Sequence, residues 1–149
     1  MTCILSLDLG TTGNRCLAID HNGKVVAQAY QEFQQYFPQP AWVEHDPIEI
    51  WTSTLQVLHQ VLDQIDTSHA VCLGITNQRE TTIAWNKQTG QPICPAIVWQ
   101  CRRTASRCAE LQSDYAESIR QKTGLPLDAY FSATKAEWII QNVDEARTL

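Results

Sequence analysis

The sequence predicts an α/β fold, because apolar strand-like runs alternate with segments of helical periodicity. Three such runs lie at residues 3–8, 14–20 and 24–33, and His21-Asn22-Gly23-Lys24 has the composition of a hairpin turn. A helical segment follows, and the apolar run 70–76 comes after it. Strands on both sides of a helix in the chain are typical of a sheet that the helix covers.

The first predicted helix has a clear start. Asp46 is a capping residue, Pro47 occupies the first helical position, and Glu49 stands at the third. Apolar side chains then recur at steps of three and four through about residue 65, so one face of the helix is expected to lie in the core. These side chains are Ile48, Trp51, Leu55, Leu58, Leu62 and Ile65.

The second half of the chain is expected to contain a strand at 81–86 and two helices. One helix extends over about 103–122, with a break near Ser113-Asp114, and Gly124 is its expected C-terminal stop. Ser132 is expected to cap the last helix.

A polar turn lies between the first two predicted strands. It reads Gly10-Thr11-Thr12-Gly13-Asn14-Arg15, and its small or hydroxylated residues let backbone N–H groups approach phosphate oxygens closely. An ordinary hairpin turn can have the same composition, and the segment has neither the Walker A spacing nor GxGxxG. Asp8 ends the preceding strand, where a carboxylate could hold a magnesium ion or its waters.

A second polar segment follows the apolar run 70–76. In Asn77-Gln78-Arg79-Glu80-Thr81-Thr82, a guanidinium and a carboxylate stand side by side at the end of a predicted strand. A polyol could donate hydrogen bonds to the carboxylate and accept them from the guanidinium. The alternative is an ion pair on the surface, which is the more common role of an arbitrary Arg-Glu dipeptide.

Several motifs in this order resemble the FGGY family of carbohydrate kinases, in particular its glycerol-phosphorylating members. The motifs are Asp8-Leu9-Gly10-Thr11-Thr12 with Arg15, Trp42 to Pro47, Asn77 to Thr82, Ile97 to Thr104, and Tyr130 to Lys135. The resemblance implies an actin-like ATPase (ribonuclease H-like) fold. It also implies transfer of the γ-phosphoryl group of ATP to a terminal hydroxyl of glycerol, with Mg²⁺ as cofactor.

On the substrate side, the resemblance implies four contacts. Arg79, Glu80 and Tyr130 would hydrogen-bond glycerol, and Trp99 would pack against its carbon face. Without the resemblance, a tryptophan in this position is equally well explained as a core residue.

On the phosphate side, the resemblance places Thr12, Gly13, Asn14 and Arg15 at the nucleotide phosphates, and Asp8 at the metal. The chain departs from the family here, because glycerol-phosphorylating members carry two serines where this chain has Gly13-Asn14. Gly13 offers a backbone N–H but no hydroxyl, so phosphate affinity is expected to differ.

By the same resemblance, residues 1–149 are expected to form the N-terminal part of the first kinase domain, on its polyol-binding and phosphate side. The aspartate that acts as catalytic base and the adenosine-binding domain are expected beyond Leu149, so the 149 residues alone are expected to be inactive. Three alternatives stay open: another FGGY sugar or polyol kinase, a non-catalytic polyol-binding or interaction module, and a degenerate gene product. A homo-oligomeric full-length protein is also left open.

Composition argues against other classes of function. The chain carries 11 Lys and Arg against 16 Asp and Glu, a formal net charge of −5, and no basic run that would follow a nucleic-acid backbone. A nuclease would need a carboxylate cluster around two metals, whereas Asp8, Asp20 and Glu80 have structural or polyol-binding roles available. No apolar stretch suits a membrane span and no signal peptide is evident, so a cytoplasmic protein is expected.

The six cysteines predict neither a zinc site nor a disulfide framework. They form no CxxC pair, and reduced thiols are expected in the cytoplasm. Cys3, Cys16 and Cys72 lie in apolar strand-like runs and are expected to be buried.

Overall fold

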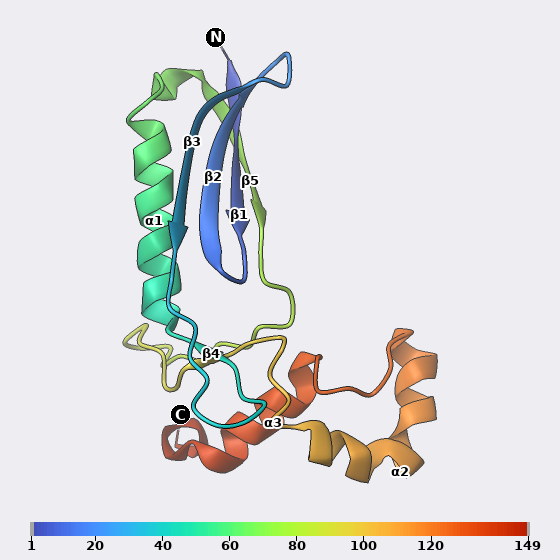
Figure 1. The fold of residues 1–149 in the computed structure, drawn as a ribbon. Coiled ribbons are helices and arrows are strands. Elements are labelled where there is room, and N and C mark those ends of the chain that lie inside the picture. The colour runs from blue at the N-terminus through green and yellow to red at the C-terminus, as the bar shows by residue number, and fades with distance from the viewer. Residues whose placement is uncertain (1, 149) are drawn as a thin grey trace. The chain divides into compact units, whose positions relative to one another are not determined.

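The computed structural model describes residues 2–148, and the chain divides into two compact units. The first unit comprises Met1–Gln35 and Asp46–Gln78, and the second comprises Tyr36–His45 and Arg79–Leu149. Long strands and one long helix build the first unit, whereas helices and irregular segments dominate the second (Figure 1). The mixed composition confirms the predicted α/β class.

A four-stranded sheet forms the first unit. Its strands are β1 (Cys3–Leu9), β2 (Gly13–Asp20), β3 (Val25–Glu32) and β5 (Ala70–Thr76), in the order β3-β2-β1-β5. β2 pairs antiparallel with both β1 and β3, and β5 pairs in parallel with β1. All the strands predicted before residue 77 are therefore confirmed.

Helix α1 (Pro47–Leu62) covers one face of this sheet (Figure 1). It begins as predicted, because the Asp46 side chain accepts a hydrogen bond from the Ile48 N–H at 2.8 Å and Pro47 fills the first turn. The helix ends at Leu62 rather than near residue 65.

Half of the apolar stripe predicted for α1 is confirmed, because Leu58, Leu62 and Ile65 are partly buried and pack against the core. The fully buried residues of α1, however, are Ser53, Thr54, Val57 and Val61. Ile48 and Trp51, which the stripe placed in the core, are 42% and 59% exposed. The helix is turned so that two small hydroxyl side chains face the sheet, where they meet the amide of Asn14. A pattern of hydrophobic residues alone cannot indicate such a face.

The core of the first unit lies between the sheet and α1. Alternate residues of each strand point into it, because successive strand residues face opposite sides of a sheet. Its buried members are Cys3, Leu5, Leu7, Cys16, Ala18, Ala27, Val57 and Val61. The predicted burial of Cys3 and Cys16 is confirmed, and all six cysteines are free thiols.

β5 is apolar but exposed. Val71 and Ile75 are 64% and 63% exposed, and Leu73 is 43% exposed. The prediction that Cys72 is buried is wrong. Within residues 2–148 β5 is one of two edge strands, and α1 packs mainly against β2 and β3. This helix therefore leaves the side chains of β5 uncovered.

The second unit combines a small sheet with two helices. Its strands are β4 (Glu44–His45) and β6 (Ala96–Ile97), and its helices are α2 (Ala105–Thr123) and α3 (Ser132–Asn142). Short 3₁₀ turns occur at η1 (Thr67–His69) in the first unit and η2 (Asp144–Arg147) in the second. No helix among the described residues is long and apolar enough to cross a membrane.

The predicted strand at 81–86 is wrong. This segment makes isolated bridges, from Thr82 to Ile97 and from Trp85 to Pro92, instead of a continuous ladder. The facing segment contains Pro92 and Pro95. Proline has no N–H to donate, so a regular ladder cannot form there.

The two helices of the second unit correct two further predictions. α2 continues through Ser113-Asp114, where the Ser113 hydroxyl donates to the Asp114 carboxylate at 2.8 Å instead of competing for the helix backbone. Gly124 ends α2 as predicted, in the left-handed conformation with φ 75°. Ser132 is the first residue of α3 rather than its cap, and its hydroxyl bonds Glu80 instead of a helix N–H.

The side chain of Arg103 packs against two tryptophan rings in the second unit. The Arg103 guanidinium lies 3.8 Å from the ring centre of Trp42 and 4.5 Å from that of Trp138, and it pairs with Glu44 at 2.5 Å. The two indoles meet edge to face at 5.3 Å. Arg103 is therefore a structural residue of this core.

Candidate functional site

The turn between β1 and β2 is built with no room for side chains at its two glycines. The Gly10 N–H donates to the Gly13 carbonyl at 3.1 Å. A Cβ at Gly10 would lie 2.8 Å from that carbonyl oxygen, and a Cβ at Gly13 would lie 2.6 Å from the carbonyl oxygen of Gln31 on β3. Both glycines are required by close backbone approach.

Hydrogen bonds to the turn carbonyls fix the direction of the turn amides. The Thr11 carbonyl accepts from the Gln35 side chain at 2.8 Å, and the Thr12 carbonyl accepts from the Phe33 N–H at 3.4 Å. In a trans peptide, C=O and N–H point in opposite directions, and the peptide bonds of the described residues are all trans. The N–H groups of Thr12 and Gly13 therefore point away from these partners.

Tyr30 occupies the space beside Gly13. Its hydroxyl would lie 2.8 Å from a Cβ at Gly13, and the Arg15 guanidinium sits 5.3 Å from the centre of its ring. At Gly13 this chain thus combines a bare backbone with a tyrosine from β3. No pattern in the sequence indicated that Tyr30 would lie beside this turn.

The side chain of Asn14 serves the helix rather than the surface of the turn. Asn14 is fully buried, and its Nδ2 donates to the Ile50 carbonyl at 3.0 Å, Ser53 Oγ at 2.8 Å and Thr54 Oγ1 at 2.9 Å. The Asn14 side-chain amide, which was expected near phosphate, instead binds α1. These hydrogen bonds anchor the start of β2, where the turn ends.

Asp8 lies near the end of β1, opposite Arg15 of β2, and both side chains are exposed. No group of three or more His, Cys, Asp or Glu residues within 2–148 could hold a metal by protein ligands alone. A single accessible carboxylate fits the way Mg²⁺ binds beside phosphates, since this ion keeps several waters and takes one or two carboxylates. Thr12 is exposed at the same turn.

In the second unit, Arg79 and Glu80 do not form the alternative surface ion pair. The Arg79 side chain is exposed, and within residues 2–148 neither an ion pair nor a hydrogen bond holds its guanidinium. Glu80 has a left-handed backbone, with φ 67°. This conformation is uncommon for a residue with a Cβ and indicates a functional constraint or local support.

The Glu80 carboxylate is held at the start of α3. Its Oε2 accepts from the Ser132 N–H at 3.1 Å and from the Ser132 hydroxyl at 2.8 Å. The N-terminal end of a helix favours a negative charge, because its N–H groups are unpaired within the helix. No described residue donates to Oε1, so this oxygen can accept from a ligand.

Two aromatic residues are connected to the segment that carries this carboxylate. The rings of Trp99 and Tyr130 meet edge to face at 5.8 Å, and each residue is half-buried. The backbone N–H of Trp99 donates a hydrogen bond to Thr81 Oγ1 at 3.3 Å. This bond connects the aromatic pair to the segment that contains Glu80. The structure thus brings together Arg79, Glu80, Trp99 and Tyr130, which are called the Glu80 cluster below.

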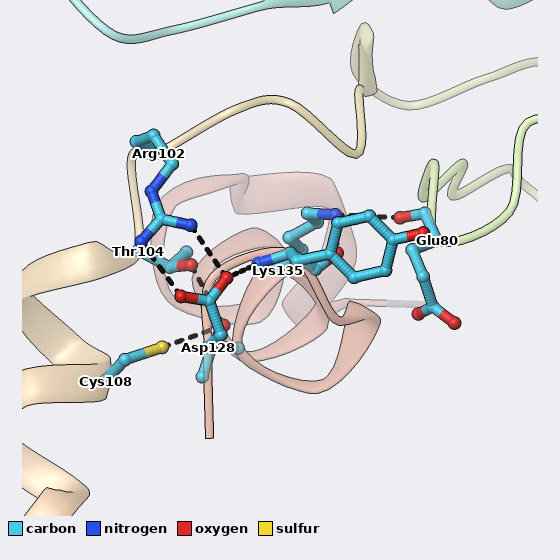
Figure 2. A network of polar contacts seen from close by, with 8 residues as sticks. Glu80, Arg102, Thr104, Cys108, Asp128 and Lys135 are labelled. Carbon is cyan, nitrogen blue, oxygen red and sulfur yellow. Dashed lines mark hydrogen bonds and ion pairs between the residues drawn. The ribbon is translucent and has the colours of Figure 1, made fainter. Parts of the chain in front are cut away.

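Two residues to which the sequence analysis assigned no role complete this region (Figure 2). Lys135 is fully buried, and its Nζ donates to the carbonyls of Glu80 at 2.8 Å and Tyr130 at 2.6 Å. Asp128 accepts from the Tyr130 N–H at 2.7 Å and from both terminal nitrogens of Arg102, at 2.7 and 3.0 Å. One feature of the sequence could have indicated that Lys135 is buried, because this charged residue lies within the apolar stripe of a predicted helix.

The electrostatics of the network follow from burial and pairing. Burial lowers the pKa of Lys135 to about 8, and the negative charge of Glu80 partly opposes that lowering. The hydrogen bonds from Arg102 hold the pKa of Asp128 below its ordinary value, and the Tyr130 N–H lowers it further. At neutral pH the network therefore contains a charged ammonium and a charged carboxylate.

Comparisons with known proteins agree with this architecture. Residues 3–148 match the N-terminal domain of the FGGY family of carbohydrate kinases. Glycerol kinase 2 of Thermotoga maritima is 51% identical to this chain, with 99% of the chain and 30% of the relative covered. The glycerol kinase of Shewanella frigidimarina is 53% identical, with 97% and 30% covered.

Solved structures show the same fold. A glycerol kinase of Plasmodium falciparum with ADP superposes with a TM-score of 0.91 at 35% identity, over 99% of this chain and 30% of that one. A xylulose kinase from Lactobacillus acidophilus superposes with a TM-score of 0.89 at 21% identity, again over 99% and 30%, and at that identity the likeness concerns the fold alone. The predicted actin-like ATPase fold is confirmed.

The chain spans about 30% of the length of the relatives it matches. The match covers both units, from the β1–β2 turn to the last helix. Residues 3–148 carry this match, and the chain belongs to the FGGY family of carbohydrate kinases.

Proposed function

We propose that the whole protein phosphorylates glycerol at a terminal hydroxyl with ATP, and that this chain supplies its polyol contacts and its phosphate turn. The product is sn-glycerol 3-phosphate. The single observation that carries the proposal is the Glu80 cluster, in which an exposed guanidinium and a carboxylate oxygen, neither bonded by a residue of 2–148, occur together with an aromatic pair. Identities above 50% to glycerol kinases support the choice of polyol.

Each member of the Glu80 cluster has a role that suits glycerol. Oε1 of Glu80 accepts hydrogen bonds from two hydroxyls, and Arg79 donates to a hydroxyl oxygen. The Tyr130 hydroxyl adds a further hydrogen bond. Trp99 packs against the carbon chain and keeps water from the face opposite the hydroxyls. Together these contacts orient one terminal hydroxyl for in-line transfer.

On the phosphate side, the N–H groups of Thr12 and Gly13 and the Arg15 guanidinium bind the nucleotide phosphates. Asn14 takes part by holding the turn on α1. Asp8 holds Mg²⁺ directly or through its waters, and this ion would neutralise charge on the phosphoryl oxygens. The base is an aspartate in the part of the protein that follows residue 149, in keeping with the family resemblance.

We place this reaction in the cytoplasm, where ATP is available. The six free cysteines suit a reducing compartment, since none of them is paired. The 149-residue chain alone is expected to be inactive, because the family resemblance assigns the base and the adenosine site to other parts of the whole protein.

A direct test uses the full-length protein with ATP, Mg²⁺ and a coupled assay of ADP release. Glycerol is compared with xylulose and gluconate, the substrates in the names of more distant kinases of the same fold. We expect kcat/KM for glycerol to exceed that for either sugar substrate by at least about 100-fold, because a site built to hydrogen-bond a small polyol discriminates strongly. A preference for xylulose or gluconate would overturn the assignment of glycerol, and ATP-independent binding without turnover would support a binding module.

A further inference from the structure

Lys135 lies where a charged side chain is unexpected. It stands on the face of α3 that also carries Thr134 and Ile139, and all three side chains are buried. Its own exposure is 0%. An ammonium in such a place is stable only when hydrogen-bond acceptors replace the water it has lost.

The acceptors of Lys135 are two backbone carbonyls, at Glu80 and at Tyr130. These carbonyls belong to two segments separated by about fifty residues, and both segments carry a member of the Glu80 cluster. Figure 2 shows Lys135 between Asp128 and Glu80. No side chain of the cluster itself is bonded to Lys135, so its Nζ acts on the backbone and leaves the ligand groups available.

We propose that Lys135 is a positioning residue, which joins the backbones of Glu80 and Tyr130 so that their side chains converge on one polyol. This inference rests on the proposed function, because it assigns a role toward the same substrate. It names a residue that touches neither glycerol nor ATP.

Two features of the backbone favour this role over simple filling of the core. The left-handed conformation at Glu80 needs support, and the bonds from Lys135 to its carbonyl and from Ser132 to its carboxylate supply it from one helix. Tyr130 is fixed at both of its polar backbone groups, since its N–H donates to Asp128 and its carbonyl accepts from Lys135.

The charge of Lys135 is consistent with the same role. Burial lowers its pKa to about 8, while Glu80, Cys101 and Asp128 raise it and Arg102 lowers it slightly further. The ammonium is therefore retained at neutral pH despite its burial. Hydrogen bonds from a charged donor are shorter and stronger than those from a neutral one.

The test measures KM for glycerol and KM for ATP separately in the full-length protein. Lys135→Met keeps the aliphatic stem and removes the donors, and Lys122→Met, on the exposed last turn of α2, is the matched control. We expect K135M to raise KM for glycerol at least about tenfold and to leave KM for ATP within about twofold, because ground-state contacts to one substrate are lost. K122M is expected to change neither value.

A double-mutant cycle identifies the route of the effect. If Lys135 acts through Glu80, then E80Q/K135M should be no more than about twofold worse with glycerol than E80Q alone, since coupled residues are not additive. Fully additive losses, an equal rise in both KM values, or an unchanged KM for glycerol in K135M would each overturn the inference.

A second variant keeps the inference testable if K135M folds poorly. Lys135→Gln keeps N–H donors on a shorter stem, so a smaller rise in KM for glycerol is expected from it. Failure of both variants to fold would assign Lys135 to stability and overturn the positioning role. A wild-type protein with no activity toward glycerol would instead overturn the proposed function, and this inference with it.

Discussion

The β1–β2 turn and the Glu80 cluster present different kinds of groups to their expected ligands. The turn offers backbone N–H groups, and its glycines leave no space for a Cβ. The Glu80 cluster offers side chains, and its backbone is held from behind by a buried lysine. A site made of backbone is sensitive to added atoms, whereas a site made of side chains is sensitive to removed functional groups. Substitutions of opposite kinds should therefore damage the two regions.

The largest effect is expected from removing groups of the Glu80 cluster in the full-length protein. Glu80→Gln weakens acceptance from hydroxyls, and Arg79→Ala removes a charged donor. Each should cost about 2–4 kcal/mol of transition-state binding, a fall of about 30-fold to almost 1,000-fold in kcat/KM for glycerol. Background ATP hydrolysis and nucleotide affinity should change little, because both residues belong to the second unit and not to the turn.

Steady-state kinetics with glycerol and ATP varied separately check this prediction. If Arg79 and Glu80 were surface residues without a ligand, both substitutions would be nearly silent, with at most about 1 kcal/mol in stability. Near-normal efficiency with glycerol in both variants would refute the polyol assignment.

The next effect comes from adding one carbon to the turn. Gly13→Ala places a Cβ 2.6 Å from the Gln31 carbonyl oxygen, which is backbone and cannot rotate away. We expect a loss of about 1–3 kcal/mol in the free energy of unfolding, as for other overpacked sites, together with a raised KM for ATP. KM for glycerol should stay near its wild-type value.

Gly74→Ala is the matched control for this change. Gly74 lies on β5, where a Cβ would meet the Leu5 carbonyl oxygen at an ordinary 3.9 Å. Thermal unfolding and nucleotide kinetics of G74A should resemble those of the wild type. Equal behaviour of the two glycine variants would mean that the close contact at Gly13 carries no constraint.

A smaller effect is expected where the turn is attached to α1. Asn14→Ala removes three hydrogen bonds to the Ile50 carbonyl, Ser53 and Thr54. Because the two hydroxyls also bond backbone carbonyls of α1, they do not become isolated, and the expected loss is about 1–2 kcal/mol in the free energy of unfolding. Hydrogen exchange should rise at the start of β2 and along the first half of α1, and unchanged exchange there would contradict the anchoring role.

The sequence predicted the local elements well where one signal determined them. Asp46 and Pro47 started α1, and Gly124 ended α2, because capping depends on the residue type at one position. The strand at 81–86 failed, since pairing depends on a distant segment that contains Pro92 and Pro95. Prediction from one segment cannot include the hydrogen-bonding capacity of its partner.

The same distinction applies to the candidate site. The family motifs indicated Arg79, Glu80, Trp99 and Tyr130, and the structure places these residues together, although their contacts with glycerol stay a prediction. Lys135 belongs to one of these motifs but was assigned no role, because a lysine is normally a surface residue. In a sequence, a polar residue that binds another element of the fold cannot be distinguished from a ligand-binding residue or a surface residue. Only its partners in the structure make the distinction.

The smallest effect is expected from removing Arg102, whose partner Asp128 accepts a hydrogen bond from the Tyr130 N–H. Arg102 and Asp128 form a two-point ion pair, but both side chains are more than a third exposed, so solvent screens their attraction. Arg102→Ala should cost about 0.2–1 kcal/mol in the free energy of unfolding at pH 7. Asp128 keeps its bond to the Tyr130 N–H in this variant, so KM for glycerol should rise by no more than about twofold.

The pH dependence of R102A gives the sign of this contribution. The pKa of Asp128 is lower in the folded protein than in the unfolded chain, first because of Arg102. Its contribution is therefore complete above the ordinary carboxyl pKa and is lost as the pH falls through the lowered value. The difference in stability between wild type and R102A should be constant from neutral pH down to about pH 5 and shrink below about pH 4. Denaturant unfolding of both proteins at pH 7, 5 and 3.5 measures it, and a gap that widened in acid would show that Arg102 acts on some other group than Asp128.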